Sequence, residues 1–274
     1  MMYIIFITYD SSSFIVLFFL NALQFILYDT TIRIAHQKSL PNMLPQLSQR
    51  LLTIANMVSQ DAFVVDIGTD HGLLPIFLIR TGRVHEAYAV DKSPKALLRA
   101  KKNISRFLVT QNCSAIQSDG FVNLNYNKPA TICLAGMGGY TMVSILERGL
   151  ETKYKTCHPI HEVIMQPNKS ALLVRRKMSQ WNWFLTSETL IKERNSFYTT
   201  MKWSPKPIEG SKELTHKEMF LGSTFLTQEK SPTYIEWLRH EKTYLIAIQK
   251  RASIHFPSHH KQHLAWIEEE LYQN

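Results

Sequence analysis

The stretch from residue 62 to residue 80 most limits what this chain can fold into. Ala62–Ile67 is a short, β-branched apolar run of the kind that forms a buried strand, and Gly68 ends it. From Leu73 the apolar residues follow a helical pattern. A strand, a glycine turn and a helix in this order present backbone N–H groups to a nucleotide-like ligand at the carboxyl edge of an α/β sheet. Asp66, just before that glycine, favours a cationic or hydroxyl-rich ligand over a pyrophosphate.

The segments that follow alternate between strand-like and helix-like patterns. Further strands are predicted at Val84–Val90, Cys113–Gln117, Ala130–Ala135 and Glu162–Gln166, and a terminal hairpin at Trp183–Ile191 and Ser196–Trp203. Strands and helices that alternate at these lengths predict a parallel sheet with both faces covered. We therefore expect an α/β protein with a doubly wound, Rossmann-like sheet.

The C-terminal quarter has a different pattern. Pro205, Pro207 and Gly210 interrupt any periodic element, so residues 43–208 are expected to form the sheet domain and residues 209–274 a helical domain. One amphipathic helix is predicted from Ser231 and a second after Pro257. Two helices joined by a short break predict a hairpin that is similar to a coiled coil.

Residues 1–42 form an N-terminal extension that does not fit the sheet pattern. Phe14–Tyr28 is an apolar run of fifteen residues, and no Lys or Arg precedes it. A membrane span needs about 20 residues, and a secretory signal begins with basic residues. We expect a dispensable extension, or a start that is wrongly assigned upstream of Met43; a membrane anchor is the alternative.

Charge and cysteine content indicate the kind of partner and compartment. Residues 43–208 carry 21 basic and 11 acidic side chains, which indicates a polyanionic partner such as a nucleic acid, or simply a basic surface. Three widely spaced cysteines without C-x-x-C spacing favour free thiols in a reducing compartment, here the cytoplasm, over disulfides or a zinc site. The histidines at 255, 259, 260 and 263 have helical spacing, but no acid or cysteine completes a metal site nearby, so we expect a surface cluster and no metal.

Acidic or glycine residues end each of the first three predicted strands. The first strand offers Asp66 and Gly68, the second offers Asp91, and the third offers Asp119 and Gly120. Parallel strands place their carboxyl ends at one edge of the sheet. Asp91 can there accept hydrogen bonds from both hydroxyls of a ribose, and Asp119 can reach the N6 amine of an adenine. Each acid alone is more often a helix cap or turn residue, but three together predict an adenosine-binding site.

The fourth and fifth strands end in groups suited to a second ligand. Ala135 is expected beside the donor, and the turn Gly136, Met137 and Gly138 would let a planar base lie against the backbone. Gln166 and Asn168 supply side-chain amides for the edge of a base. Close helix packing at the glycine turn and structural caps at the two amides are the alternatives.

Four short sequence motifs, taken together, give this chain a specific resemblance to a known family. V-D-I-G-T-D-H-G-L-L-P, S-D-G, L-A-G-M-G-G and M-Q-P-N, in this order, resemble the bacterial tRNA (adenine-22-N1)-methyltransferase family, often called TrmK, over about residue 44 to the C-terminus. The leader L-S-Q-R-L-L-T-I-A and the segment M-F-L-G-S-T-F-L are also similar. The resemblance implies a class I methyltransferase fold, S-adenosylmethionine as the methyl donor, and methylation of N1 of an adenine in tRNA. Gly72 and Leu73 depart from the family, which often has Ala and Tyr there.

Asp70 and His71, which follow the donor-binding glycine, are the predicted catalytic residues. Attack by N1 leaves a positive charge on the adenine, and a carboxylate can stabilise it and accept the N6 proton; turn formation and helix capping are the structural alternatives. Two basic groups could contact tRNA phosphates, although a solvated helix face is the commoner role for any single residue; they are Lys92, Lys95, Arg99, Lys101, Lys102 and Arg106, and Arg175, Arg176 and Lys177.

Two other functions stay open from the sequence. The chain could methylate another substrate, a small metabolite or a protein, or it could be a non-catalytic RNA-binding module with a relic donor pocket. A monomer or weak dimer is expected.

Overall fold

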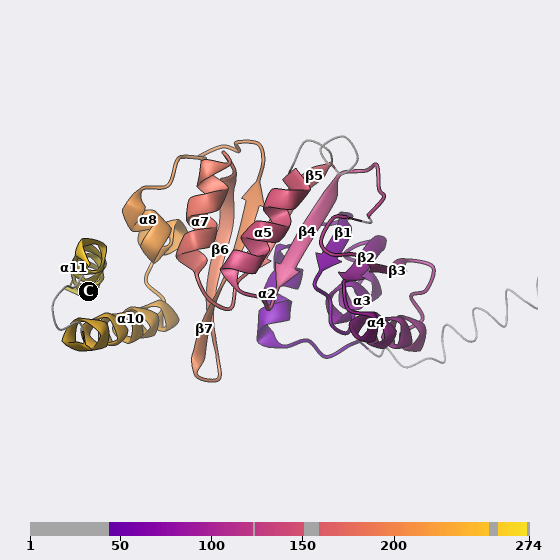
Figure 1. The fold of residues 1–274 in the computed structure, drawn as a ribbon, viewed down its shortest axis with the longest axis horizontal. Coiled ribbons are helices and arrows are strands. Elements are labelled where there is room, and N and C mark those ends of the chain that lie inside the picture. The colour runs from indigo at the N-terminus through magenta and orange to yellow at the C-terminus, as the bar shows by residue number, and fades with distance from the viewer. Residues whose placement is uncertain (1–43, 123, 151–158, 252–256, 273–274) are drawn as a thin grey trace, which may run out of the picture. The chain divides into compact units, whose positions relative to one another are not determined.

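A seven-stranded sheet organises the protein in the computed structural model, which describes residues 44–122, 124–150, 159–251 and 257–272 (Figure 1). The strand order is β3-β2-β1-β4-β5-β7-β6. The strands are β1 (Phe63–Ile67), β2 (Glu86–Asp91), β3 (Cys113–Gln117), β4 (Ala130–Ala135), β5 (Ile160–Gln166), β6 (Phe184–Glu193) and β7 (Ser196–Ser204). The first five strands pair in parallel, and β7 pairs antiparallel with both β5 and β6. The predicted Rossmann-like fold with a terminal hairpin is therefore confirmed.

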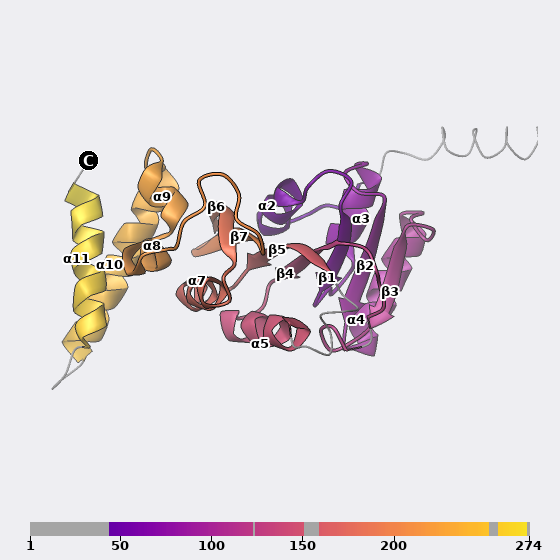
Figure 2. The same ribbon diagram turned by 90° about the horizontal axis from the view of Figure 1, so that it is seen from above.

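Helices cover the sheet on both faces. They are α2 (Gln49–Met57), α3 (Leu73–Arg80), α4 (Pro94–Arg106), α5 (Gly139–Leu150) and α7 (Ala171–Gln180). In β1, Val64 packs in one hydrophobic cluster with residues of α2 and α3, whereas Val65 packs in another with residues of α5 and α7. Successive strand residues point to opposite faces, so an uninterrupted apolar run fits a strand that is covered on both sides. Figure 2 shows α5 and α7 below the edge of the sheet and α2 above it.

Two helix starts near the site are fixed by their sequence. Ser93 accepts a hydrogen bond from the N–H of Ala96, and Pro94 takes the first position of α4, as predicted. Ser48 caps α2 in the same way, through the N–H of Leu51. These caps place α2 and α4 beside the carboxyl edge of the sheet.

The chain after β7 is helical. It forms α8 (His216–Leu221), α9 (Ser223–Thr227), α10 (Pro232–Arg251) and α11 (Ser258–Tyr272). These helices share a hydrophobic cluster of their own, which includes Leu238 and Ile267. The two predicted C-terminal helices are therefore present. The short helices α8 and α9 precede them, within residues 209–274, which were expected to be helical.

Arg175 joins α7 to this helical region, and its predicted contact with tRNA phosphates is wrong. Its side chain is only 3% exposed and forms an ion pair with Glu188 of β6, with Nη2 2.5 Å from Oε1. It also donates a hydrogen bond of 2.9 Å to the carbonyl of Met219 in α8. A cation buried against a carboxylate cannot meet solvent-exposed phosphates. Arg176, one residue later, is exposed.

The structure bears on the predicted free cysteines and on a possible membrane span, but not on the N-terminal extension. Cys113 and Cys133 are free and buried. No helix among the described residues is both long enough and apolar enough to cross a membrane. Residues 1–42, with their apolar run, and Cys157 lie outside the described residues.

Candidate active site

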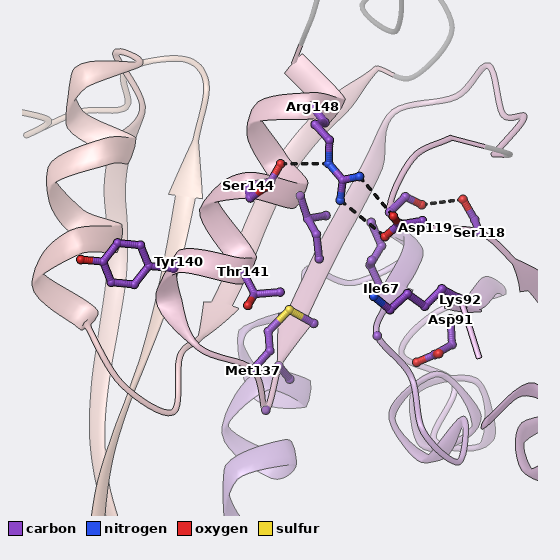
Figure 3. Close-up of a pocket in the computed structure, with 15 residues that line it drawn as sticks. Ile67, Asp91, Lys92, Ser118, Asp119, Met137, Tyr140, Thr141, Ser144 and Arg148 are labelled. Atoms are coloured by element: carbon purple, nitrogen blue, oxygen red, sulfur yellow. Dashed lines mark hydrogen bonds and ion pairs between the residues drawn. The ribbon is translucent and has the colours of Figure 1, made fainter. Parts of the chain in front are cut away.

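Two adjoining cavities lie at the carboxyl edge of the sheet. The larger, of about 560 Å³, is bordered by the ends of β1, β2 and β4, by the loop after β3 and by one side of α5 (Figure 3). Its lining includes seven residues predicted to bind a ligand, namely Gly68, Asp91, Asp119, Gly120, Ala135, Gly136 and Met137. The smaller, of about 390 Å³, shares Gly68, Ala135 and Gly136 with it. The turns after β1 and β4 therefore lie between two chambers.

Gly68 brings bare backbone to both cavities. Its φ of +85° lies in the region that glycine tolerates, and a Cβ added there would come within 2.5 Å of Cε of Met137. The N–H groups of Gly68 and Thr69 donate hydrogen bonds of 2.8 and 2.9 Å to the carbonyl of Val90. The turn is thus held against the end of β2, and any side chain at residue 68 would take space from the cavities.

Asp91 ends β2 and lines the larger cavity, and its carboxylate also accepts a hydrogen bond from the backbone nearby. Its Oδ1 accepts a hydrogen bond of 2.7 Å from the N–H of Ser93. This bond fixes the carboxylate at the start of α4. The turn role and the ligand role that the sequence left as alternatives are compatible here, because a carboxylate has four acceptor positions.

Asp119 faces the larger cavity but is bonded to Arg148 of α5. Arg148 Nη1 lies 3.2 Å from Oδ2 of Asp119, and Nη2 lies 3.4 Å from Oδ1. The hydrogen bond from Arg148 lowers the pKa of Asp119, against a smaller opposing effect of burial. Arg148 was not anticipated from the sequence, since a single arginine in an amphipathic helix gives no signal of its own.

The smaller cavity contains both predicted catalytic residues, and also Asp66. Asp70 and His71 line it together with Gln166 and with Arg50 of α2. Asp66, predicted to bind the donor with Asp91, lies on this side of the turn and does not line the larger cavity. The donor-side acids are therefore divided between two chambers.

Asp66 is a buried carboxyl group with a displaced pKa. Its exposed fraction is 6%, and burial raises its pKa from 3.8 to about 6. The hydrogen bond with Thr69 lowers the pKa, and the nearby charge of Asp91 raises it slightly. Asp66 therefore changes charge close to neutral pH, in contact with the cavity.

The raised pKa of Asp66 predicts that the free energy of unfolding depends on pH. Because the folded-state pKa is raised, the stabilising effect of protonated Asp66 is complete below about pH 4 and is lost as the pH rises through about 6. Asp66→Asn cannot ionise, so at pH 8 and without ligand it is expected to be more stable than the native chain by about 3 kcal/mol. Urea unfolding at pH 4 and pH 8 measures this, with Glu147→Gln on the exposed side of α5 as the control. An advantage of the same size at both pH values would contradict it.

Asp70 and His71 contact each other and α4. His71 Nε2 lies 3.0 Å from Oδ2 of Asp70, and Arg99 of α4 forms an ion pair with Oδ1. Asn103 of α4 donates a hydrogen bond of 2.9 Å to the carbonyl of His71. Arg99 was predicted to contact phosphate, but the structure places it on a carboxylate at the site. The pair of predicted catalytic residues is thus oriented by the helix that follows β2.

Arg50 bonds to the side-chain amides of Gln166 and Asn168, which were predicted to form hydrogen bonds with the edge of a base. Its Nη1 lies 3.2 Å from Oδ1 of Asn168 and 3.5 Å from Oε1 of Gln166. Asn168 Nδ2 donates a hydrogen bond of 2.6 Å to the carbonyl of Gly136, and Gln166 Nε2 donates one to the carbonyl of Pro167. These contacts agree with the structural alternative for both amides. Gly138 lines neither cavity. The string L-S-Q-R-L-L contained Arg50, but its spacing did not show which strand ends it would meet.

The histidine-rich helix does not form a metal centre in the described chain. No group of three or more potential His, Cys, Asp or Glu ligands occurs among the described residues. His263 is half-buried and stacks on Phe220, with ring centroids 3.8 Å apart. Burial lowers the pKa of His263 to about 4. It is therefore a packing residue and not the surface residue that was predicted; His255 lies outside the described residues.

Comparisons with known proteins agree with this geometry. The family model described as "Methyltransferase domain" matches residues 47–201, which is more than half of the chain. A tRNA (adenine(22)-N(1))-methyltransferase of Bacillus subtilis is 24% identical over 209 residues, covering 76% of this chain and 86% of the relative. A putative tRNA methyltransferase of Mycoplasma pneumoniae is 32% identical over 182 residues, covering 64% and 79%. The structure of M. capricolum TrmK with S-adenosyl-homocysteine superposes with a TM-score of 0.69 at 25% identity, covering 82% of this chain and 98% of that one.

Proposed function

The chain belongs to the methyltransferase-domain family, among the tRNA (adenine-22-N1)-methyltransferases, and on that premise we propose that it transfers a methyl group from S-adenosylmethionine to N1 of adenine 22 in tRNA. One observation supports this most directly. The ends of the first four strands of the sheet open into two cavities that meet at Gly68 and Gly136. Two chambers that meet at bare backbone suit a donor and an acceptor whose reacting atoms must come together.

The residues of the larger cavity fit the donor. Asp91 offers a carboxylate to the ribose hydroxyls, and Asp119 offers one to the adenine amine. Gly68 offers backbone at the wall of the cavity, where a Cβ would come within 2.5 Å of Cε of Met137. Asp66, on the other side of the turn, is suited to the ammonium group of the methionine part. When bound, S-adenosylmethionine supplies an electrophilic methyl group on a sulfonium.

The residues of the smaller cavity would position the acceptor adenine. N1 of adenine is a nucleophile without prior deprotonation, so placing it correctly provides much of the rate. Gly136, on the wall shared by the two cavities, would contact the base, whereas Met137 lines only the larger cavity and Gly138 lines neither. Gln166 lines the smaller cavity, and Asn168 would hold the turn through its hydrogen bond to the carbonyl of Gly136. Asp70 would accept the N6 proton as the ring becomes positive, and His71, at 3.0 Å from it, would pass the proton to solvent.

Exposed lysines of α4 and the residues around it would contact the tRNA backbone. Lys95, Lys101 and Lys102 are exposed, as are Lys92 and Arg106. Reversing the charge of the three helix lysines to Glu is expected to reduce the slope of log Kd against log salt by roughly 2 to 3, because each phosphate contact releases about one counterion. Filter binding of tRNA from 50 to 300 mM salt measures the slope. Lys206→Glu, beyond β7 and at the opposite edge of the sheet, is the control, and an unchanged slope in the triple variant would contradict the assignment.

One experiment tests the function. The purified chain is incubated with S-adenosylmethionine and unmodified tRNA, and the methylated base is mapped by primer extension and mass spectrometry. We expect 1-methyladenosine at position 22, and none in a transcript that carries guanine there. Methyl transfer without tRNA would favour another substrate, and tRNA binding without turnover would favour a non-catalytic RNA-binding module.

A further inference from the structure

Arg148 is held at all three of its guanidinium nitrogens. Its Nε donates a hydrogen bond of 3.4 Å to the carbonyl of Ser144, one turn earlier in α5. Its two terminal nitrogens bond to the two oxygens of Asp119, at 3.2 and 3.4 Å. Figure 3 shows this chain of contacts running from α5 across the larger cavity to the loop after β3. Arg148 thus links α5, which forms one wall of the cavity, to Asp119 in the loop after β3.

The fork geometry fixes the orientation of the Asp119 carboxylate. Two parallel N–H···O bonds define the plane and direction of a carboxylate, which a single contact does not. Each oxygen still has an acceptor position that Arg148 does not use. The loop itself is held by the hydroxyl of Ser118, which donates a hydrogen bond of 2.8 Å to the carbonyl of Gly120. Asp119 is therefore presented to the cavity as a fixed, acceptor-only group.

A second cavity also borders the carboxylate of Asp119. A cavity of about 290 Å³ is lined by Lys92, Gln117, Ser118 and Asp119. Gln117 Nε2 donates a hydrogen bond of 3.3 Å to the carbonyl of Lys92, which closes the loop ends of β2 and β3 together. Asp119 and Lys92 are the charged side chains among these four residues. The Asp119 carboxylate, whose direction Arg148 sets, therefore borders both this cavity and the larger one.

We infer that Arg148 is a positioning residue that makes Asp119 select a donor nucleoside by the amino group of its base. This inference rests on the proposed function, in which Asp119 faces the adenine of the donor. Adenine carries a hydrogen-bond donor at position 6, whereas hypoxanthine carries a carbonyl acceptor there. An ionised carboxylate accepts a bond from the first and repels the second. A site whose polar group would be left unpaired discriminates strongly against the wrong ligand.

Calorimetric binding of two nucleosides tests the inference without turnover. The affinities of S-adenosylhomocysteine and S-inosylhomocysteine are measured for the native chain and for Arg148→Ala, Arg148→Lys and Asp119→Asn. The native chain should prefer the adenine compound. The Arg148 and Asp119 side chains are 41% and 51% exposed, so Arg148→Ala should reduce that preference by about threefold, because the Asp119 carboxylate is then free to rotate. Arg148→Lys should behave more like alanine than like arginine, because an ammonium group cannot form the fork. Asp119→Asn should lose the preference, because an amide can donate to the carbonyl of hypoxanthine.

Lys128→Ala provides the matched control. Lys128 forms an exposed ion pair with Glu86 at the start of β2, the opposite edge of the sheet, so its removal should leave both affinities unchanged. An unchanged preference in Arg148→Ala, or an equal loss of both affinities, would overturn the inference while leaving the proposed function intact. Failure of the native chain to bind S-adenosylhomocysteine would overturn the proposed function, and the inference with it.

Discussion

Asp70→Asn is expected to lower the rate of methyl transfer to tRNA by about 10²- to 10⁴-fold, the range that proton transfer by a positioned side chain contributes. The substitution preserves the shape of the side chain but removes the charge that pairs with Arg99 and the acceptor that lies 3.0 Å from His71. Single-turnover rates with saturating tRNA and donor measure the effect. Binding of S-adenosylhomocysteine should remain within a few-fold of native, because Asp70 does not line the larger cavity.

Arg99→Ala separates the acid from its ion pair. This variant keeps the carboxylate of Asp70 and its contact with His71, so it should retain more activity than Asp70→Asn. Near-native single-turnover rates in Asp70→Asn would remove Asp70 from the mechanism. A parallel loss of S-adenosylhomocysteine binding would instead assign it to the shape of the turn.

Arg175→Met is expected to reduce the free energy of unfolding by about 3 to 5 kcal/mol, because it leaves the Glu188 carboxylate buried without its partner. Both side chains are almost fully buried, at 3% and 0% exposure. The same substitution removes the hydrogen bond to the carbonyl of Met219, which joins the sheet domain to α8. Equilibrium unfolding in urea, followed by circular dichroism, measures the loss.

A double variant distinguishes the loss of the ion pair between Arg175 and Glu188 from the loss of side-chain packing. Arg175→Met with Glu188→Gln removes both charges, so it should recover much of the stability. Arg176→Met, at the exposed neighbour in α7, should change stability by less than about 0.5 kcal/mol. A loss in Arg175→Met no larger than that would contradict the role given to this ion pair.

The strands were predictable because their signals are local. β3 and β4 have the predicted ends, and the other strands differ by one to three residues. β1, β4 and β5 are largely apolar and stop before a glycine or proline, and such runs fit buried parallel strands. The meeting of Asp66, Asp91 and Asp119 at one edge followed from parallel pairing alone.

The partners of those acids could not be predicted in the same way. Asp119 binds Arg148 and Asp70 binds Arg99, each pair 29 residues apart and on different elements. No periodic pattern connects such positions, since they meet only after two helices have packed on the sheet. Arg175 shows the converse: three adjacent basic residues resemble a surface cluster, yet the helical period turns one of them into the core.

The contact of Arg50 with the terminal hairpin has a consequence for synthesis of the protein. The backbone N–H of Arg50 bonds to Glu193, 143 residues later in the chain, and its guanidinium lies over the ring of Tyr198. Contacts of such long sequence separation form late in folding. On the ribosome, β1 to β4 and α5, which line the larger cavity, emerge before β6 and β7, which hold Arg50 at the wall of the smaller cavity. A nascent chain could therefore hold a nucleoside before it can present an acceptor base, so competence for methyl transfer should arise only as translation of the sheet domain ends.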